Sequence, residues 1–220
     1  MPEQAYMESL IKSPNRIMIY IDSKRCKEKT LRKRYGEDAV ICDVTSQSQN
    51  KQLVRLSPFF PHGDIPVPFS NGITASCVEA VWQGLKVFEN CDVDVSVFEN
   101  TSMKNIKRTT RRYGRVLGHR KGVNGTELLD YVTARKDIYL PTFLWVLENK
   151  VKPILDRLKE ANETKKIVLL DFTTNSDPFD TTQPLSHAYL IKAYAEGEYP
   201  DMIKSQPINN FPTDLFSCQD

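Results

Sequence analysis

Three short apolar runs rich in β-branched residues stand out along the chain. They are 17–21 (IMIYI), 39–44 (AVICDV) and 167–172 (IVLLDF). Runs of this length that are apolar throughout are typical of strands buried in a sheet. The sequence therefore predicts a small central sheet. Asp22 and Ser23 follow the first run in the position of a helix cap, which predicts a helix over 24–35 that ends at Gly36.

Other segments carry apolar residues at helical spacing. After the Pro- and Gly-punctuated stretch 56–72, which reads as an aromatic-rich loop, Thr74 or Ser76 is expected to cap a helix that runs to about Asn90. Its predicted apolar face consists of Val78, Val81, Trp82, Leu85 and Phe88. Further helices are predicted over 125–136, 141–161 and 184–196, where Pro141 and Pro184 suit a first helical turn.

These elements predict an α+β fold, a helix-rich single domain spanning 1–220 around a small sheet, with 199–220 as a loosely docked C-terminal extension. The composition, 40% hydrophobic and 26% charged, is ordinary for a globular domain. No run approaches the roughly 18 apolar residues of a membrane span. The five cysteines are scattered without C-x-x-C spacing. We expect a cytoplasmic protein with reduced thiols, no membrane partner, no cofactor and no metal.

One polar row lies beside the apolar face of the helix predicted after the aromatic loop. Glu79, Gln83 and Lys86 are four and three residues apart, so they share one side of that helix. Such a row is either a solvated surface or a carboxylate held at a pocket wall by a neighbouring lysine. The spacing leaves both interpretations open.

A second group of carboxylates follows the third predicted strand. Asp171 stands at its carboxyl end, where an open sheet commonly presents ligand-binding groups. Asp177 and Asp180 lie in the next loop, within reach of the same place. Since Asn, Ser, Asp and Pro favour turns, we interpret Asp180 as a turn residue.

A basic stretch, 104–121 (KNIKRTTRRYGRVLGHRK), contains no carboxylate. Its glycines and the crowding of Arg111, Arg112 and Arg115 favour phosphate recognition, because guanidinium groups pair well with phosphate oxygens. A solvated face is the alternative. The basic residues of 24–34 are interpreted as a solvated helix face.

Histidines and aromatic residues supply further candidates. The histidines show no metal-ligand spacing, and His62 and His119 are retained as substrate contacts. Phe59, Phe60 and Trp82 either stack on a base or pack in the core.

The loop 56–72 followed by 75–86 (ASCVEAVWQGLK) resembles the signature of the NADAR (YbiA-like) N-glycosidase superfamily. The resemblance rests on Ser57, Phe59 or Phe60, Pro61, Val78, Glu79, Gln83 and Lys86. Stretches such as WQGLKVFE, LGHRKGVNGTELLDY and PLSHA resemble an uncharacterised bacterial and phage family, a remote relative of NADAR proteins. Cys77 and Ala80 depart from the usual serine and histidine of that signature, and the closing tryptophan-glycine pair is absent.

The resemblance implies a NADAR-like fold and a hydrolase that cleaves a C–N glycosidic bond, in a phosphorylated ribosylamino-pyrimidine or an ADP-ribosylated base. Such cleavage builds oxocarbenium character on the ribose, which a carboxylate stabilises while water is deprotonated. The implied roles are charge stabilisation or water activation by Glu79, tuning by Lys86, and ribose orientation by Asp171 or Asp177. Phosphate is then expected on Arg111, Arg112, Arg115 and His119, and aromatic or amide contacts on Phe59, Phe60, His62, Trp82 and Gln83.

Two other functions stay open. A non-enzymatic nucleic-acid-binding accessory protein would use the two basic segments, and a nucleotide-binding sensor would use a decayed enzyme core. The chain contains no Walker A motif, no GxGxxG after a strand and no G-x-S-x-G elbow. NTPase, Rossmann dehydrogenase and α/β-hydrolase interpretations therefore lose their main support.

Overall fold

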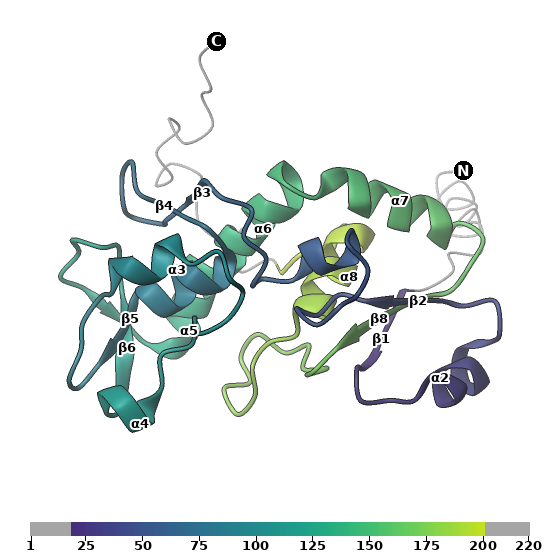
Figure 1. Ribbon diagram of the computed structural model, residues 1–220, viewed down its shortest axis with the longest axis horizontal. Coiled ribbons are helices and arrows are strands. Elements are labelled where there is room, and N and C mark those ends of the chain that lie inside the picture. Colours follow the sequence, from purple (N-terminus) through teal and green to yellow (C-terminus); the bar gives the residue numbers. More distant parts are fainter. Residues whose placement is uncertain (1–18, 201–220) are drawn as a thin grey trace, which may run out of the picture.

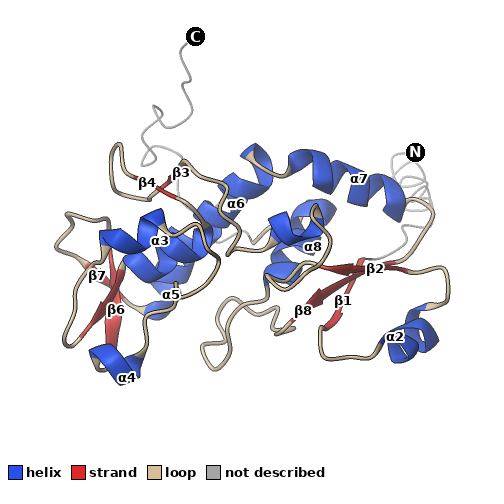
Figure 2. Ribbon diagram, viewed as in Figure 1, coloured by secondary structure: helices blue, strands red, loops and turns tan. Residues whose placement is uncertain are grey.

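A computed structural model describes residues 19–200 and has the predicted α+β character (Figures 1 and 2). Its central sheet consists of the three predicted strands, β1 (Ile19–Ser23), β2 (Val40–Asp43) and β8 (Ile167–Asp171). All pairing in this sheet is parallel and β8 lies in the middle, with Ile19 and Val40 both opposite Ile167. The carboxyl ends of all three strands therefore meet at one edge.

Strand β8 is buried on both faces, which explains its uninterrupted apolar sequence. Ile167 and Leu169 face the main core, whereas Val168 and Leu170 pack with Leu31 of α2 (Glu28–Tyr35). The predicted start of α2 was wrong, because Asp22 and Ser23 belong to β1 and a turn separates them from the helix. Its predicted end is confirmed, since Gly36 follows with a φ of 107°, which favours glycine.

Helices α7 (Lys152–Asn162) and α8 (His187–Glu196) cover the side of the sheet opposite α2, and α6 (Leu140–Asn149) joins α7 to the region around Val78–Gly84 (Figure 1). The single helix predicted over 141–161 was wrong. Pro153 has no N–H and its ring would clash with the carbonyl of Asn149, so α6 ends and α7 begins with proline in its first turn. Helix α8 also begins later than predicted, with Ser186 as its cap.

The second part of the molecule surrounds α3 (Val78–Gly84), which ends earlier than predicted. The cap is the side chain of Cys77, which accepts a hydrogen bond from Ala80 N, rather than Thr74 or Ser76. Beyond the helix, Lys86–Phe88 forms β5, which pairs antiparallel with β6 (Val116–Arg120). Lys86 and Phe88 therefore do not belong to α3, and the β-branched and aromatic residues of β5 suit a strand.

The helix predicted over 125–136 was wrong at its start. Leu128–Leu129 forms β7, which pairs with β6, and Asp130 then caps α5 (Tyr131–Ala134). The chain continues as η3 (Arg135–Tyr139), a π-helical turn that leads into α6. Shorter elements complete this part: η1 (Leu53–Leu56), β3 (Ile65–Pro66), β4 (Thr74–Ala75), η2 (Val95–Glu99) and α4 (Thr110–Tyr113). The predicted loop 56–72 is confirmed apart from Leu56, which ends η1, and the two residues of β3.

The two parts lie side by side and share one hydrophobic core. Figure 1 shows the α3 region at one end and the β1-β8-β2 sheet at the other, with α6 and α7 running between them. Within residues 19–200, no helix is long and apolar enough to cross a membrane. Of the predicted extension, the hydroxyl of Tyr199 donates to Leu140 O over 2.9 Å, and 201–220 lies outside the described residues.

Candidate active site

A cavity of about 670 Å³ opens between α3 and the carboxyl edge of the central sheet. Residues that directly follow β1, β2 and β8 contribute to its floor, as expected for an open parallel sheet. The wall opposite is formed by α3, the loop before it and the segment before α4. The lining residues are Arg25, Thr45, Ser46, Ser57, Pro58, Phe59, Glu79, Trp82, Gln83, Lys86, Lys107, Arg108, Thr109, Tyr131, Arg135, Tyr139, Asp171, Phe172, Thr173, Gln183, Pro184, Leu185 and His187.

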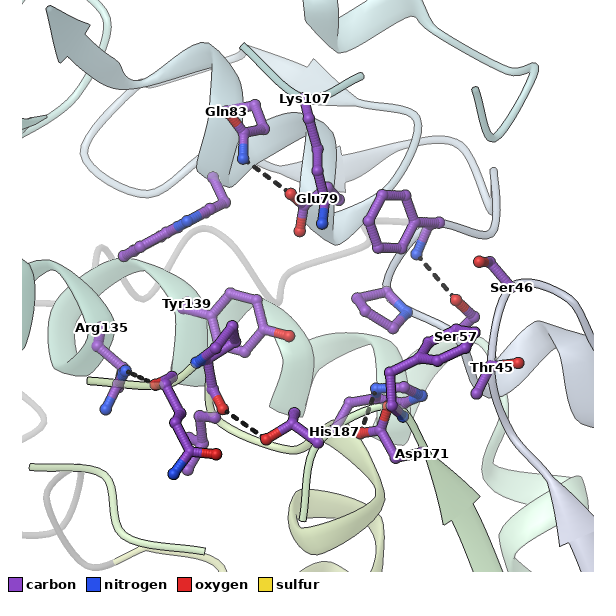
Figure 3. Close-up of a pocket in the computed structure, with 18 of the residues that line it drawn as sticks. Thr45, Ser46, Ser57, Glu79, Gln83, Lys107, Arg135, Tyr139, Asp171 and His187 are labelled. Atoms are coloured by element: carbon purple, nitrogen blue, oxygen red, sulfur yellow. Dashed lines mark hydrogen bonds and ion pairs between the residues drawn. The ribbon is translucent and has the colours of Figure 1, made fainter. Parts of the chain in front are cut away.

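Glu79 is the central acidic group of this wall (Figure 3). Its side chain is buried, and Gln83 Nε2 donates to its Oε1 over 2.8 Å. Gln83 Oε1 in turn accepts from the backbone N–H of Arg108 over 3.1 Å, which fixes the orientation of the amide. Among residues 19–200, no cationic nitrogen lies within 4.0 Å of the carboxylate. Glu79 is thus a positioned carboxylate with one oxygen left for a ligand.

Burial shifts the pKa values of Glu79 and Lys86, the two ionisable groups of the predicted polar row, in opposite directions. It raises the pKa of Glu79, an effect that the Gln83 hydrogen bond and the nearby charges of Lys86 and Lys107 only partly offset. Burial also lowers the pKa of Lys86, despite the opposing attraction of Glu79. The ammonium of Lys86 lies 5.8 Å from the ring centroid of Trp82. Both groups are therefore shifted toward the neutral pH range, as is common where proton transfer takes place.

Asp171 belongs to a buried ion pair on the opposite side of the cavity (Figure 3). His187 Nδ1 lies 2.9 Å from Asp171 Oδ2, and His187 Nε2 lies 2.9 Å from the carbonyl oxygen of Val44. Since both ring nitrogens face acceptors, both carry a proton and the imidazole is cationic. Burial alone would lower the pKa of His187, but the charge of Asp171 and these hydrogen bonds raise it.

The same pair determines the charge of Asp171. Burial alone would raise its pKa, but the His187 charge and the hydrogen bonds from His187, Ser186 and Phe172 N lower it. The carboxylate is therefore held as an anion with its lone pairs largely occupied. It suits orientation of a ligand better than proton transfer.

Tyr139 is a site residue that the sequence interpretation missed. It lies in η3, and its hydroxyl points into the cavity (Figure 3). Burial, together with the charges of Glu79 and Asp171, raises its pKa well above the ordinary value, so the phenol is a neutral hydrogen-bond donor. Its ring packs edge-on against Trp82, with centroids 5.7 Å apart. No helical or strand periodicity distinguishes a residue in a π-helical turn, so Tyr139 could not be recognised from the sequence pattern.

Two lining arginines serve structural purposes. The guanidinium of Arg108 donates to the carbonyls of Gln83, Lys86 and Asp92 over 2.6–3.1 Å, which joins the end of α3 to β5. Arg135 is 2% exposed and donates to the carbonyls of Pro178, Asp180 and Gln183 over 2.5–3.3 Å. It thereby fastens the segment 173–186 beside the cavity.

Two other lining cations are exposed and remain free to bind an anion. Arg25 follows β1, and Lys107 precedes Arg108. No carboxylate among residues 19–200 lies within 4.0 Å of either charge, whereas the neighbouring Lys24 is paired with Asp43 at 2.6 Å. Arg25 was interpreted from sequence as a solvated helix residue. Its position directly after a buried strand, like that of Asp171, was the signal that could have identified it.

The structure brings several predicted site residues into the cavity and leaves others outside it. Inside are Phe59, Glu79, Trp82, Gln83, Lys86 and Asp171. Arg111, Arg112 and Arg115 do not line the cavity; they are exposed on or just after α4, and Arg115 pairs with Glu89 at 3.2 Å. Asp177 is an exposed turn residue that accepts from Phe179 N, and Asp180 also forms a turn, as predicted.

The two histidines retained as substrate contacts also lie outside the lining. His119 is fully buried and stacks on Trp82 with ring centroids 3.7 Å apart, and burial lowers its pKa to about 3. His62 Nε2 lies 2.8 Å from Arg55 O, its ring packs on Phe60, and burial lowers its pKa to about 4. His119 supports the aromatic wall from behind, and His62 and Phe60 shape the preceding loop.

Residues 19–200 contain no group of three or more His, Cys, Asp or Glu side chains arranged to hold a metal ion. Comparison with known proteins places residues 23–191, well over half of the chain, within the model of a protein family of unknown function, DUF6939. No curated protein matches the chain.

Proposed function

We propose that this chain, which belongs to DUF6939, a protein family of unknown function, is a hydrolase that cleaves an N-ribosyl bond. The proposed substrate is a phosphorylated nucleotide-like molecule or an ADP-ribosylated base. One observation carries the proposal. Glu79 is a buried carboxylate with a raised pKa, oriented through a single hydrogen bond and facing a cavity rimmed by free cations.

The chemistry needs only an anion of this kind and water. As the C1′–N bond breaks, its electron pair leaves with the base, and positive charge develops on C1′ and the ring oxygen. Glu79 stabilises that charge and accepts a proton from the water whose oxygen adds to C1′. The proton is finally delivered to the departing base, so atoms and charges balance. Asp171, held as an anion by His187, is suited to accept hydrogen bonds from ribose hydroxyls.

The resemblance to NADAR proteins supports this proposal and remains a prediction. Val78, Glu79 and Gln83 share α3 as the resemblance implies, and the 2.8 Å hydrogen bond joins Glu79 to Gln83. Lys86 lies on β5 instead, yet its charge still acts on Glu79. A NADAR-like fold is proposed on the same grounds.

The first test is turnover by the Glu79→Gln variant. NAD, ADP-ribose, a ribosylamino-pyrimidine phosphate and ADP-ribosylated DNA are incubated with the protein, and mass spectrometry records release of the base. We expect wild type to consume one of these substrates and the variant to lose at least about a hundredfold in rate, because an amide stabilises no cationic transition state. Glu160→Gln, an exposed change on α7, serves as the matched control.

The folded state of Glu79→Gln is checked by thermal unfolding before its rate is interpreted. Full turnover by this variant would reject Glu79 as the reacting carboxylate. Ligand binding without base release by wild type would instead favour the sensor on a decayed enzyme core.

A nucleic-acid-binding accessory role is the second candidate, because Arg111 and Arg112 are exposed on α4 and do not line the cavity that contains Glu79. Neither has a carboxylate within 4.0 Å among residues 19–200. This role requires affinity for generic DNA or RNA that falls steeply with salt. Binding that is absent, or insensitive to salt, rejects it.

A further inference from the structure

The cavity has two chemically different ends, with Glu79 between them (Figure 3). The end at the sheet presents the hydroxyl-bearing residues Thr45, Ser46 and Ser57. The other end presents aromatic rings, among them Tyr139. Arg135 also lines the aromatic end, but its guanidinium already donates to three backbone carbonyls, so a ligand with one anionic and one planar part is favoured with its anion toward the sheet end.

The sheet end has the groups that hold a phosphoryl group. Arg25 follows β1 and contributes an exposed guanidinium, and Lys107 extends beside Glu79 (Figure 3), with its ammonium 5.6 Å from the ring centroid of Phe59. Ser57 Oγ accepts from Phe59 N and retains its own proton for donation. Two cations without a carboxylate partner and a hydroxyl donor match the charge and the acceptor oxygens of a phosphate dianion.

The aromatic end consists of rings that pack against one another. Trp82 is fixed from behind by the stacked ring of His119 and flanked edge-on by Tyr131 and Tyr139, at centroid distances of 5.6 and 5.7 Å. The Tyr139 hydroxyl points into the cavity as a donor. Preformed rings with one polar group are typical of sites for planar heterocycles.

We propose that the ribose of the substrate carries a phosphoryl group, which binds toward the sheet end on Arg25, Lys107 and Ser57. The leaving base then lies at the aromatic end beside Trp82 and Tyr139. This inference rests on the proposed function and specifies how the substrate is oriented in the cavity. In this orientation the scissile C1′–N bond lies next to Glu79. Unphosphorylated nucleosides lack the group that anchors this direction and are poor ligands.

The phosphoryl end is tested with ribose 5-phosphate as the probe, in isothermal titration calorimetry. We expect Arg25→Gln and Lys107→Gln each to weaken its binding about tenfold, the effect of removing one charge-assisted contact. Arg112→Gln removes an exposed arginine outside the cavity and is expected to leave the affinity unchanged. Undetectable binding by wild type, or equal loss in all three variants, overturns the assignment.

The aromatic end is tested through the emission of Trp82. The chain contains two tryptophans, so Trp145→Phe leaves Trp82 as the only indole. AMP, GMP, CMP and UMP place a base beside it, and at least one of them is expected to quench its emission, whereas ribose 5-phosphate is not. Equal quenching by ribose 5-phosphate, or no quenching by any of the four nucleotides, overturns the proposed direction.

The outcomes separate this inference from the proposed function. Turnover that depends on Glu79, combined with phosphate binding that ignores Arg25 and Lys107, refutes the direction and leaves the hydrolase intact. Directional binding without base release by wild type refutes the hydrolase and leaves the subsites intact.

Discussion

The environment of Glu79 makes its protonation a measurable property of the site. Burial raises its pKa above the ordinary 4.5, and the hydrogen bond from Gln83 works in the opposite direction. The ionised form is the active one in the proposed reaction. Below the raised pKa the carboxyl group is protonated and cannot stabilise positive charge.

We therefore expect kcat/KM to fall on the acid side with a midpoint above 4.5. Gln83→Met removes the hydrogen bond that lowers the pKa, so the midpoint moves to higher pH. The measurement is a pH–rate profile of wild type and variant on the same substrate. If the midpoint of the acid-side fall in kcat/KM is the same in Gln83→Met as in wild type, the ionising group is not Glu79.

Residue patterns predicted some of the site and not the rest. The four-residue spacing of Glu79 and Gln83 correctly placed both on one helix face, because helical geometry is local. Asp171 was found because it stands at the carboxyl end of a buried strand. Arg111 and Arg112 illustrate the limit: a cluster of charges in sequence does not say which side chains reach a cavity and which remain in solvent.

At the scale of elements, α3 is held in place by close contact with η2. A Cβ added at Gly84 would lie 2.2 Å from a ring carbon of Phe98, a distance at which one element must shift. This contact helps to fix the helix that presents Glu79 to the cavity.

Gly84→Ala is accordingly expected to destabilise the protein by about 1–3 kcal/mol through overpacking. Urea unfolding followed by circular dichroism measures the change. Phe98→Leu in the same chain relieves the clash, so the double variant is expected to lose less stability than the two single changes together. Strict additivity would show that the two residues do not meet.

The limits of prediction at this scale have physical causes. The three strands were recognisable because each contains a short apolar run, although only β8 is buried along its whole length. The ends of the helices were harder to predict from the sequence. The stop of α3 depends on pairing between β5 and β6, two segments far apart in sequence, which a local pattern does not contain.

At the scale of the whole molecule, one ion pair joins three elements. His187 at the start of α8 contacts Asp171 at the end of β8 and the carbonyl of Val44 just after β2. The pair therefore ties the sheet edge to the helix that covers it.

The raised pKa of His187 makes its contribution to stability depend on pH. The contribution is fully present below the unfolded value of 6.5 and is lost as the pH rises through the higher folded pKa. The lowered pKa of Asp171 adds stability that is present above 3.8 and lost as the pH falls through the folded pKa. The pair is therefore strongest in the mildly acidic range between these limits.

We expect His187→Asn to cost about 3–5 kcal/mol at about pH 6, because it leaves Asp171 as a buried unpaired charge. The cost becomes smaller above the folded pKa of His187, where wild type has also lost the cation. Urea unfolding at about pH 6 and about pH 9 measures both values. His62→Asn is the control with the opposite sign: burial lowers the pKa of His62 to about 4, so the unfolded chain binds its proton first as the pH falls, and the cost of this change is expected to be smaller at about pH 6 than at about pH 9.

The order β1-β8-β2 has a consequence for how the protein is made. Strands β1 and β2 leave the ribosome well before β8, yet they do not pair with each other, since the strand that separates them begins only at Ile167. Most of the chain must therefore be synthesised before the sheet closes, and with it the floor of the cavity. Until then the N-terminal strands expose unpaired edges, and we expect nascent chains shorter than this to depend on chaperones.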